Sequence, residues 1–318
     1  MKKPNEKTLV IILSETRAWQ FTFDKFKQNL LNVFDADLAL CVANNEREDR
    51  QNPFYKEAKY IWQSEEYDDW GRGLEELISD YQADWRKVAN IKDQWLGGIK
   101  TNPQHKGSAG ILLYFRAFLK KCLEESGVLE VYDRIIITRS DFIYNIPHLP
   151  PRYLDNQFIW IPNGEDYGGY TDRHILCPTK YILEVLSVAE NILKEPNQLI
   201  KQLNNYNYWN LESYLKFAYH EKGLGKLIKR FPYIMYAVKA KNAHTSWSQG
   251  VYNEKFGYNI KYKHEYTSSQ IASLIITKDW GFAGFHFTTI ILNLYNLLIY
   301  IFRVSKRLIK LLISPRTS

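Results

Sequence analysis

The segment that most constrains the fold of this chain is Asp133–Asn145, with the sequence DRIIITRSDFIYN. Its four consecutive β-forming residues, Ile135–Thr138, are typical of a strand that is buried on both faces of a mostly parallel sheet. Arg139, Ser140 and Asp141 follow at once. A carboxylate just past the carboxyl end of such a strand lies where open α/β sheets bind their ligands. Asp141 is therefore the first candidate for a functional residue.

The preceding segments predict an α/β fold with a mostly parallel, Rossmann-type sheet flanked by helices. Thr8–Leu13 and Ala36–Val42 have strand patterns, and Phe21–Phe34 between them has apolar residues at helical spacing. This order predicts parallel strands joined by right-handed crossovers. Gly107–Glu125 has a helical period of apolar residues and leads into the strand described above.

The rest of the chain contains further elements and one segment with a different composition. Phe158–Ile161 and Tyr233–Lys239 predict strands, while Thr179–Leu193 predicts a helix and a second helix begins near Asn210. Asn44–Asn102 is rich in charge, tryptophan and asparagine. We expect this segment to be an insertion or a lid.

The C-terminal segment combines an uncharged run with basic residues. From Gly281 to Phe302 no residue is charged, with His286 counted as neutral. Polar residues then recur at steps of four and three, which places them on one stripe of a helix; they are Thr289, Asn293, Asn296, Tyr300, Arg303, Arg307 and Lys310. A polar and basic stripe on an otherwise apolar helix predicts an interfacial anchor on an anionic membrane surface. One alternative is a helix that spans the membrane, and another is packing of the tail on the protein's own core. If the tail binds a membrane, it is therefore peripheral or single-span.

The distribution of charge argues against a nucleic-acid partner. The formal net charge is +7, and the chain after Trp280 holds five basic residues and no acidic one. The remaining chain is therefore close to neutral, whereas nucleic-acid-binding domains present a basic face. We expect the anionic partner of this protein to act at the C-terminus.

The chain resembles bacterial GT-A-type glycosyltransferases that build lipopolysaccharide or capsular polysaccharide. The resemblance covers residues 8–247 and rests on six segments in order: LVIILSETR, KGS at 106–108, IIITRSD, DYGGYTDRH, NLESYL and NAHTSW. Arg139 stands where the Asp-x-Asp turn of that family has its first aspartate. The resemblance implies a GT-A-like fold and transfer of a sugar from a nucleotide-sugar donor to a lipid-linked or surface-polysaccharide acceptor.

The resemblance implies that Asp141 binds a divalent cation, Mn²⁺ or Mg²⁺, on the donor diphosphate. Both ions favour oxygen ligands, and one carboxylate is sufficient when phosphates complete the shell. His244, in the NAHTSW segment, is a second candidate for a metal or phosphate contact. Arg139 is a candidate for contact with phosphate or ribose. The alternative is that Arg139 and Asp141 form a structural ion pair at the end of the strand.

Two other segments are candidates for binding the nucleotide-sugar. Ser14 and Arg17 lie in the turn after the first strand, where the resemblance implies contact with the nucleotide. Lys106 and Ser108 open a predicted helix, and the free NH groups at a helix start favour an anion. Ordinary N-capping by Ser108 explains the same residues.

An inverting transferase also needs a carboxylate as general base beside the acceptor hydroxyl. Glu212 lies near a predicted helix start, and Asp172 lies in the glycine-containing loop of DYGGYTDRH. Glycines let the backbone of such a loop approach a sugar closely. Glu165 and Asp166 are further carboxylates in that loop. The alternative for each of these four carboxylates is that it binds the acceptor or is an ordinary surface group.

These expectations define two regions. Residues 1–275 form the transferase domain, with a nucleotide-binding half at about 1–146 and an acceptor-side half at about 147–275, and residues 276–318 form a membrane-associating tail. The protein is then expected at the cytoplasmic face of the inner membrane. A catalytically inactive, membrane-associated scaffold or binding module in a polysaccharide assembly complex is the alternative, which the missing first aspartate favours.

Overall fold

The computed structural model describes residues 6–45, 49–90, 95–102, 105, 107–204, 209–243, 248–276 and 282–313. Its centre is a seven-stranded sheet with the order β3-β2-β1-β4-β7-β6-β8. The bounds are β1 Thr8–Ser14, β2 Asp37–Ala43, β3 Ala58–Ser64, β4 Arg134–Thr138, β6 Ile159–Pro162, β7 Ile175–Pro178 and β8 Ile228–Phe231. Strand β7 is antiparallel to both of its neighbours, and the other pairings are parallel. The α/β fold with a mostly parallel sheet is confirmed.

The two central strands are buried on both faces, as their sequences predict. Strand β4 is buried at all five positions, and in β1 successive side chains enter two different cores. Leu9 and Ile11 belong to one core, whereas Val10 and Ile12 belong to the other. This division follows from the period of two along a strand and requires a helical layer on each face of the sheet.

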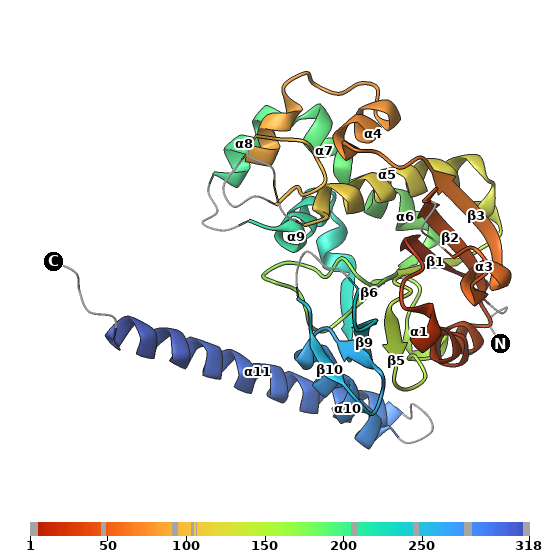
Figure 1. Cartoon of the computed structure of the whole chain (residues 1–318), viewed down its shortest axis with the longest axis vertical. Helices are drawn as coiled ribbons and strands as arrows, with labels where there is room; N and C mark the ends of the chain where they lie inside the picture. The colour runs from red at the N-terminus through yellow and green to blue at the C-terminus, as the bar shows by residue number, and fades with distance from the viewer. Residues whose placement is uncertain are drawn as a thin grey trace.

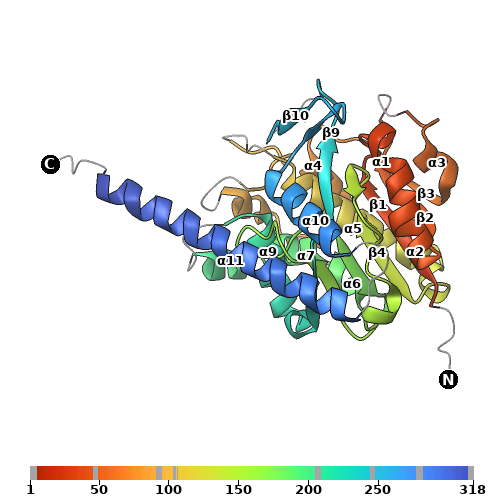
Figure 2. The same ribbon diagram turned by 90° about the horizontal axis from the view of Figure 1, so that it is seen from below.

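Figures 1 and 2 show these two layers. One face carries α4 (Trp70–Leu77), α5 (Ala109–Glu125), α6 (Thr179–Leu186), α7 (Val188–Lys194), α8 (Pro196–Leu203) and α9 (Leu211–Glu221). The other face carries α1 (Trp19–Phe26), a π-helical turn at Lys27–Leu31, α2 (Asn32–Phe34), α3 (Pro53–Glu57), α10 (Lys263–Ile275) and the start of α11 (Phe282–Ile313). The helices predicted over Phe21–Phe34 and Gly107–Glu125 are present with small shifts of their ends.

A second, four-stranded sheet has the order β10-β11-β9-β5. Its bounds are β5 Phe142–Tyr144, β9 Met235–Lys239, β10 Val251–Asn253 and β11 Tyr258–Ile260. The strand predicted at Tyr233–Lys239 is therefore present, but it belongs to this smaller sheet. Because β5 follows β4 after a three-residue turn, the second sheet begins beside the carboxyl end of β4.

The expectation that Asn44–Asn102 forms an insertion or a lid was wrong. This segment supplies strand β3 to one edge of the main sheet and helix α4 to the layer that packs on α5. Trp85 is fully buried in the same core as β1. Many charged residues of the segment lie on the outer surface, while Trp70, Trp85 and Trp95 are buried.

Helix α11 packs on the body through its first half and extends beyond it at the other end (Figure 1). Thr288 and Leu292 are buried, and Asn296 Oδ1 lies 2.9 Å from His264 Nε2. Asn293, on the same polar stripe, accepts a hydrogen bond of 2.5 Å from Asn163. Two members of the polar stripe, Asn293 and Asn296, thus contact the body of the protein, although Asn293 stays exposed. Within the described ranges, no helix combines the length and apolarity needed to cross a membrane.

One buried carboxylate joins three parts of the fold. Glu265 of α10 is fully buried and forms an ion pair with Arg173, which precedes β7. Its Oε1 also accepts a hydrogen bond of 2.9 Å from the Tyr233 hydroxyl, and its Oε2 accepts one of 2.8 Å from the Ala237 NH of β9. Glu265 therefore fixes α10 and the second sheet relative to the main sheet.

We expect Glu265→Gln to lower the free energy of unfolding by about 3–5 kcal/mol, because it removes the shortest ion pair of the buried Arg173 and leaves only the longer ones to Asp172 and Glu165. Urea unfolding measured by circular dichroism gives this value. Glu254→Gln, on the exposed turn between β10 and β11, is the matched control and should have almost no effect. Equal stabilities for the two variants would show that the pair does not hold the fold together.

Candidate functional site

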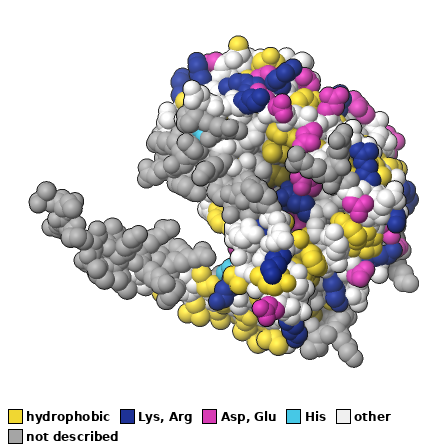
Figure 3. Space-filling view, viewed as in Figure 1, with side chains coloured by type: hydrophobic (Ala, Val, Ile, Leu, Met, Phe, Trp, Pro, Cys, Tyr) yellow, Lys and Arg dark blue, Asp and Glu magenta, His cyan; other side chains and the backbone are white. Residues whose placement is uncertain are grey.

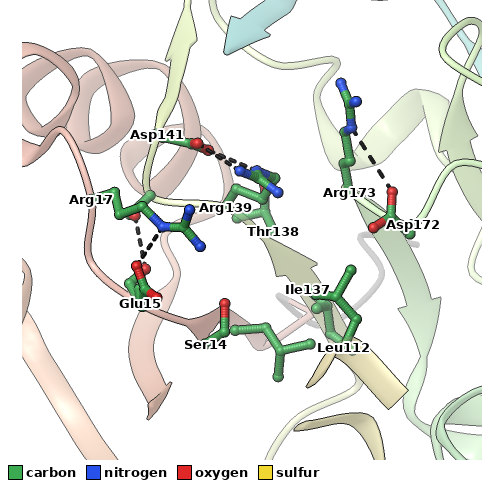
Figure 4. Close-up of a pocket in the computed structure, with 12 residues that line it drawn as sticks. Ser14, Glu15, Arg17, Leu112, Ile137, Thr138, Arg139, Asp141, Asp172 and Arg173 are labelled. Carbon is green, nitrogen blue, oxygen red and sulfur yellow. Dashed lines mark hydrogen bonds and ion pairs between the residues drawn. The ribbon is translucent and has the colours of Figure 1, made fainter. Parts of the chain in front are cut away.

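A narrow hollow, partly open to solvent, lies at the carboxyl ends of β1 and β4 (Figure 4). Side chains from the β1–α1 loop, the β4–β5 turn, α5 and the loop before β7 surround it. Its lining residues are Leu13, Ser14, Glu15, Arg17, Leu112, Ile137, Thr138, Arg139, Ser140, Asp141, Asp172 and Arg173. Five candidates from the sequence, Ser14, Arg17, Arg139, Asp141 and Asp172, therefore lie around one cavity.

The turn after β1 is held in a defined shape. Ser14 has a φ of 83°, a left-handed conformation that a serine adopts only when its surroundings impose it. The buried Ser140 donates a hydrogen bond of 2.9 Å from its hydroxyl to the Glu15 carbonyl. Asn52 donates another, of 2.8 Å, to the Thr16 hydroxyl. These contacts fix the β1–α1 loop against the β4–β5 turn and against the residue that caps α3 (Pro53–Glu57).

Arg139 and Asp141 form a two-point ion pair within the β4–β5 turn. Arg139 Nε lies 2.7 Å from Asp141 Oδ1, and Arg139 Nη2 lies 2.6 Å from Asp141 Oδ2. Burial by itself would raise the pKa of Asp141, but the Arg139 guanidinium beside it holds this pKa well below its usual range. Asp141 is thus an anion whose two oxygens both accept hydrogen bonds.

This arrangement does not fit a metal ion at Asp141. Both oxygens already face a guanidinium, which repels a divalent cation. Among the residues that the structure describes, no group of three or more His, Cys, Asp and Glu side chains is placed to hold a metal. The Mn²⁺ or Mg²⁺ expected at Asp141 stays a prediction, and so does the metal contact of His244, which lies outside the described residues.

The antiparallel strand β7 brings a distant loop to the cavity. Its register with β4, continued past the strand ends, sets Thr138 beside His174 and Arg139 beside Arg173. The Thr138 hydroxyl lies 3.0 Å from His174 Nδ1. Asp172 therefore reaches the same cavity as Asp141, although the two residues are 31 positions apart in the sequence.

The two candidate bases lie close to each other. Glu212 is in the first turn of α9, whose N-cap Asn210 accepts a hydrogen bond of 2.8 Å from the Ser213 NH. The glycine-containing loop packs directly on this turn, because a Cβ at Gly169 would lie 1.8 Å from the Glu212 carbonyl oxygen. Burial, followed by the nearby Asp172 carboxylate, raises the pKa of Glu212 to about 8. Glu212 does not itself line the cavity.

The other sequence candidates have different outcomes. Ser108 is exposed at the N-cap of α5, makes no side-chain capping hydrogen bond and does not line the cavity. Lys106 lies outside the described residues. Sequence reasoning missed Arg173, although it directly follows Asp172. It also missed Lys261, which faces Arg139 and Asp141 only because of how the second sheet folds.

Comparisons with known proteins include a distant likeness to a solved structure. No family model matches the chain, and no curated protein matches it. Among solved structures, mouse xyloside xylosyltransferase 1 in its apo form is similar, with 11% identity over 71% of this chain and 85% of the other, at a TM-score of 0.36. A likeness this distant assigns no function, which must rest on the residues of the site.

We expect Glu212→Gln to raise the melting temperature by a few degrees at pH 8. The pKa of Glu212 rises from 4.5 to about 8 in the fold, so the folded protein keeps a proton that the unfolded chain releases. Stability from this group is therefore lost as pH rises from about 4.5 to about 8. Thermal unfolding between pH 5 and 9 tests this, with exposed Glu221→Gln at the other end of α9 as control. An unchanged pH profile in Glu212→Gln would contradict the raised pKa.

Proposed function

We propose that this protein is a glycosyltransferase that uses a nucleotide-sugar donor. The observation that supports this most is the shared cavity of Ser14, Arg17, Arg139, Asp141 and Asp172. These residues come from three separate loops, and they meet at the carboxyl edge of a mostly parallel sheet, where such folds bind nucleotides. The ordered segments that resemble GT-A enzymes supply the same residues.

The proposed reaction divides the residues between donor and acceptor. Arg17 and Arg139 contact the diphosphate, while Ser14 lies on the side of the ribose and base. When the bond between the anomeric carbon and the diphosphate oxygen breaks, the electron pair leaves with the diphosphate. In an inverting reaction, the acceptor oxygen forms the new bond, and its proton moves to Asp172 or Glu212. The pKa of Glu212, about 8, suits a general base at neutral to mildly alkaline pH.

The finer identity of the substrates follows from the sequence resemblance. We propose a glycan or lipid-linked acceptor of lipopolysaccharide or capsule biosynthesis, and a donor that carries a hexose. The division into a nucleotide-binding half at about 1–146 and an acceptor-side half at about 147–275 belongs to the same proposal.

We expect the full chain to gain thermal stability with nucleoside diphosphates and nucleotide-sugars of one base, because ligands that bind the folded state raise the melting temperature by mass action. With the donor so identified, Asp172→Asn or Glu212→Gln should lower kcat by about 10²–10⁴-fold and leave donor binding intact. Glu221→Gln is the matched control. If nucleotides bind but no variant or acceptor gives turnover, the scaffold alternative is correct; if none binds, both proposals fail.

We further propose that α11 attaches the protein to the cytoplasmic face of an anionic membrane. Its outward side chains are apolar and recur at helical spacing: Phe287, Ile290, Leu294, Leu297, Leu298 and Ile301, each more than half exposed. Hydrophobic side chains gather along this edge, over α10 and the start of α11 (Figure 3). The sequence that follows contains basic residues and no acidic ones. An apolar face next to positive charge matches an anionic lipid surface.

We expect the full chain to co-sediment with vesicles that contain phosphatidylserine. The triple variant Ile290→Ser, Leu294→Ser and Leu298→Ser should lose this binding without unfolding, since these side chains are exposed. Val251→Ser, which changes an exposed valine on β10, should bind as the unchanged protein does. Equal binding by the triple variant would rule out α11 as the attachment surface.

A further inference from the structure

Lys261 is a cation close to Arg139 and Asp141, which line the cavity, although it does not line the cavity itself. The reaction described above does not use Lys261. It directly follows β11 and is half-buried. The sheet places it there: the Val238 NH of β9 donates a hydrogen bond of 2.9 Å to the Asp141 carbonyl, and Val238 pairs with Ile260 of β11. The Lys261 NH in turn donates one of 2.9 Å to the Ala237 carbonyl.

Three arginines lie near Lys261. The Arg173 guanidinium lies 4.2 Å from the centre of the Tyr262 ring, and Lys261 Nζ lies 5.4 Å from the same point. Arg139 and Arg17, which line the cavity beside Arg173, complete the group. Figure 4 shows that Arg17 and Arg139 extend toward the same space from opposite loops.

Carboxylates balance the three arginines but not the lysine. Arg17 pairs with Glu15 at 2.5 Å, Arg139 pairs with Asp141, and Arg173 pairs with Glu265. Within the described part of the chain, Lys261 has no ion pair with a carboxylate. Burial, followed by the neighbouring Arg139, lowers the pKa of Lys261 to about 8, while Asp141 acts in the opposite direction. Arg173 and Arg17 lower this pKa further.

Because no carboxylate forms an ion pair with Lys261, its positive charge lacks a compensating negative charge, which an incoming anion supplies. The attraction is greatest for an anion with several charges, because the guanidinium groups of Arg17, Arg139 and Arg173 lie near Lys261 and can bind it too, although carboxylates balance their charges. Guanidinium and ammonium groups both bind phosphate through charge-assisted hydrogen bonds. The unpaired charge of Lys261 repels a divalent cation.

We propose that Lys261, together with Arg17, Arg139 and Arg173, binds the diphosphate of the donor directly and without a metal ion. This inference rests on the proposed transferase function and assigns the charge neutralisation to side chains of the protein. Asp141 then acts as a positioning residue, which holds the Arg139 guanidinium at the cavity through its two hydrogen bonds.

The test measures binding of pyrophosphate and of nucleoside diphosphates to the full chain by calorimetry, in EDTA and in Mn²⁺. We expect binding in EDTA of at least the strength found in Mn²⁺. Lys261→Met keeps the aliphatic stem and removes the charge. It should weaken binding by about 10–100-fold, the range for a hydrogen bond to a charged group. Lys255→Met, on the exposed turn of the same hairpin, is the matched control and should bind normally.

Two further readouts separate a binding role from a structural one. Lys261→Met should keep or raise the melting temperature of the free protein, because it removes an unpaired charge from among three arginines. In the unchanged protein, affinity for the nucleoside diphosphate should fall as pH rises above about 8, where Lys261 loses its proton, and Lys261→Met should lack this dependence. A large loss of thermal stability in Lys261→Met would mean that the lysine supports the fold, which would overturn the inference.

The outcomes distinguish this inference from the function on which it rests. Binding of nucleoside diphosphates only in Mn²⁺, or equal binding by Lys261→Met, would overturn the metal-free site and leave the transferase proposal standing. Binding of pyrophosphate in EDTA, weakened by Lys261→Met, with no preference for any nucleotide, would support the cationic site and overturn the transferase. Absence of binding to every probe in both conditions would overturn both.

Discussion

The buried ion pair between Arg173 and Glu265 is the interaction on which the geometry of the cavity depends. Arg173 lies on the loop that carries Asp172. Glu265 lies on α10, the helix that follows β11 and Lys261. Two hydrogen bonds, from Tyr233 and from the Ala237 NH, fix the same carboxylate. Charges buried this deeply are stable only when paired and hydrogen-bonded, so the pair allows little freedom to either element.

A network of this kind places Arg17, Arg139 and Arg173 around one small space, with Lys261 nearby. Arg116, almost fully buried on α5, donates a hydrogen bond of 3.1 Å to the Asp172 carbonyl and so supports the loop from behind. Ser140 joins the two loops on the opposite side. The cavity therefore lies at the edge of the main sheet, and it is held by Ser140, which lines it, and by Arg116, which does not.

Much of the fold and part of the site were predictable, because both follow from local patterns. The uninterrupted run Ile135–Thr138 predicts a strand that is buried on both faces. Because β1 and β4 are parallel neighbours, the polar residues that follow them lie at the same edge of the sheet. This placed Ser14, Arg17, Arg139 and Asp141 correctly around one cavity. The lid expected at Asn44–Asn102 failed because its charges were taken as evidence for exposure of the whole segment, whereas Trp85 and α4 fill the core.

The sequence by itself determined the layered α/β architecture and the residues at the strand ends, since the periods of strands and helices are local properties. Only the tertiary structure decided what those residues contact. The antiparallel strand β7 set Asp172 and Arg173 beside Arg139, and the second sheet brought in Lys261 from far along the chain. The fold also set Asn293 and Asn296 of α11 against the body and left several apolar residues of that helix exposed. Such pairings depend on register and packing between distant segments, which no local pattern specifies.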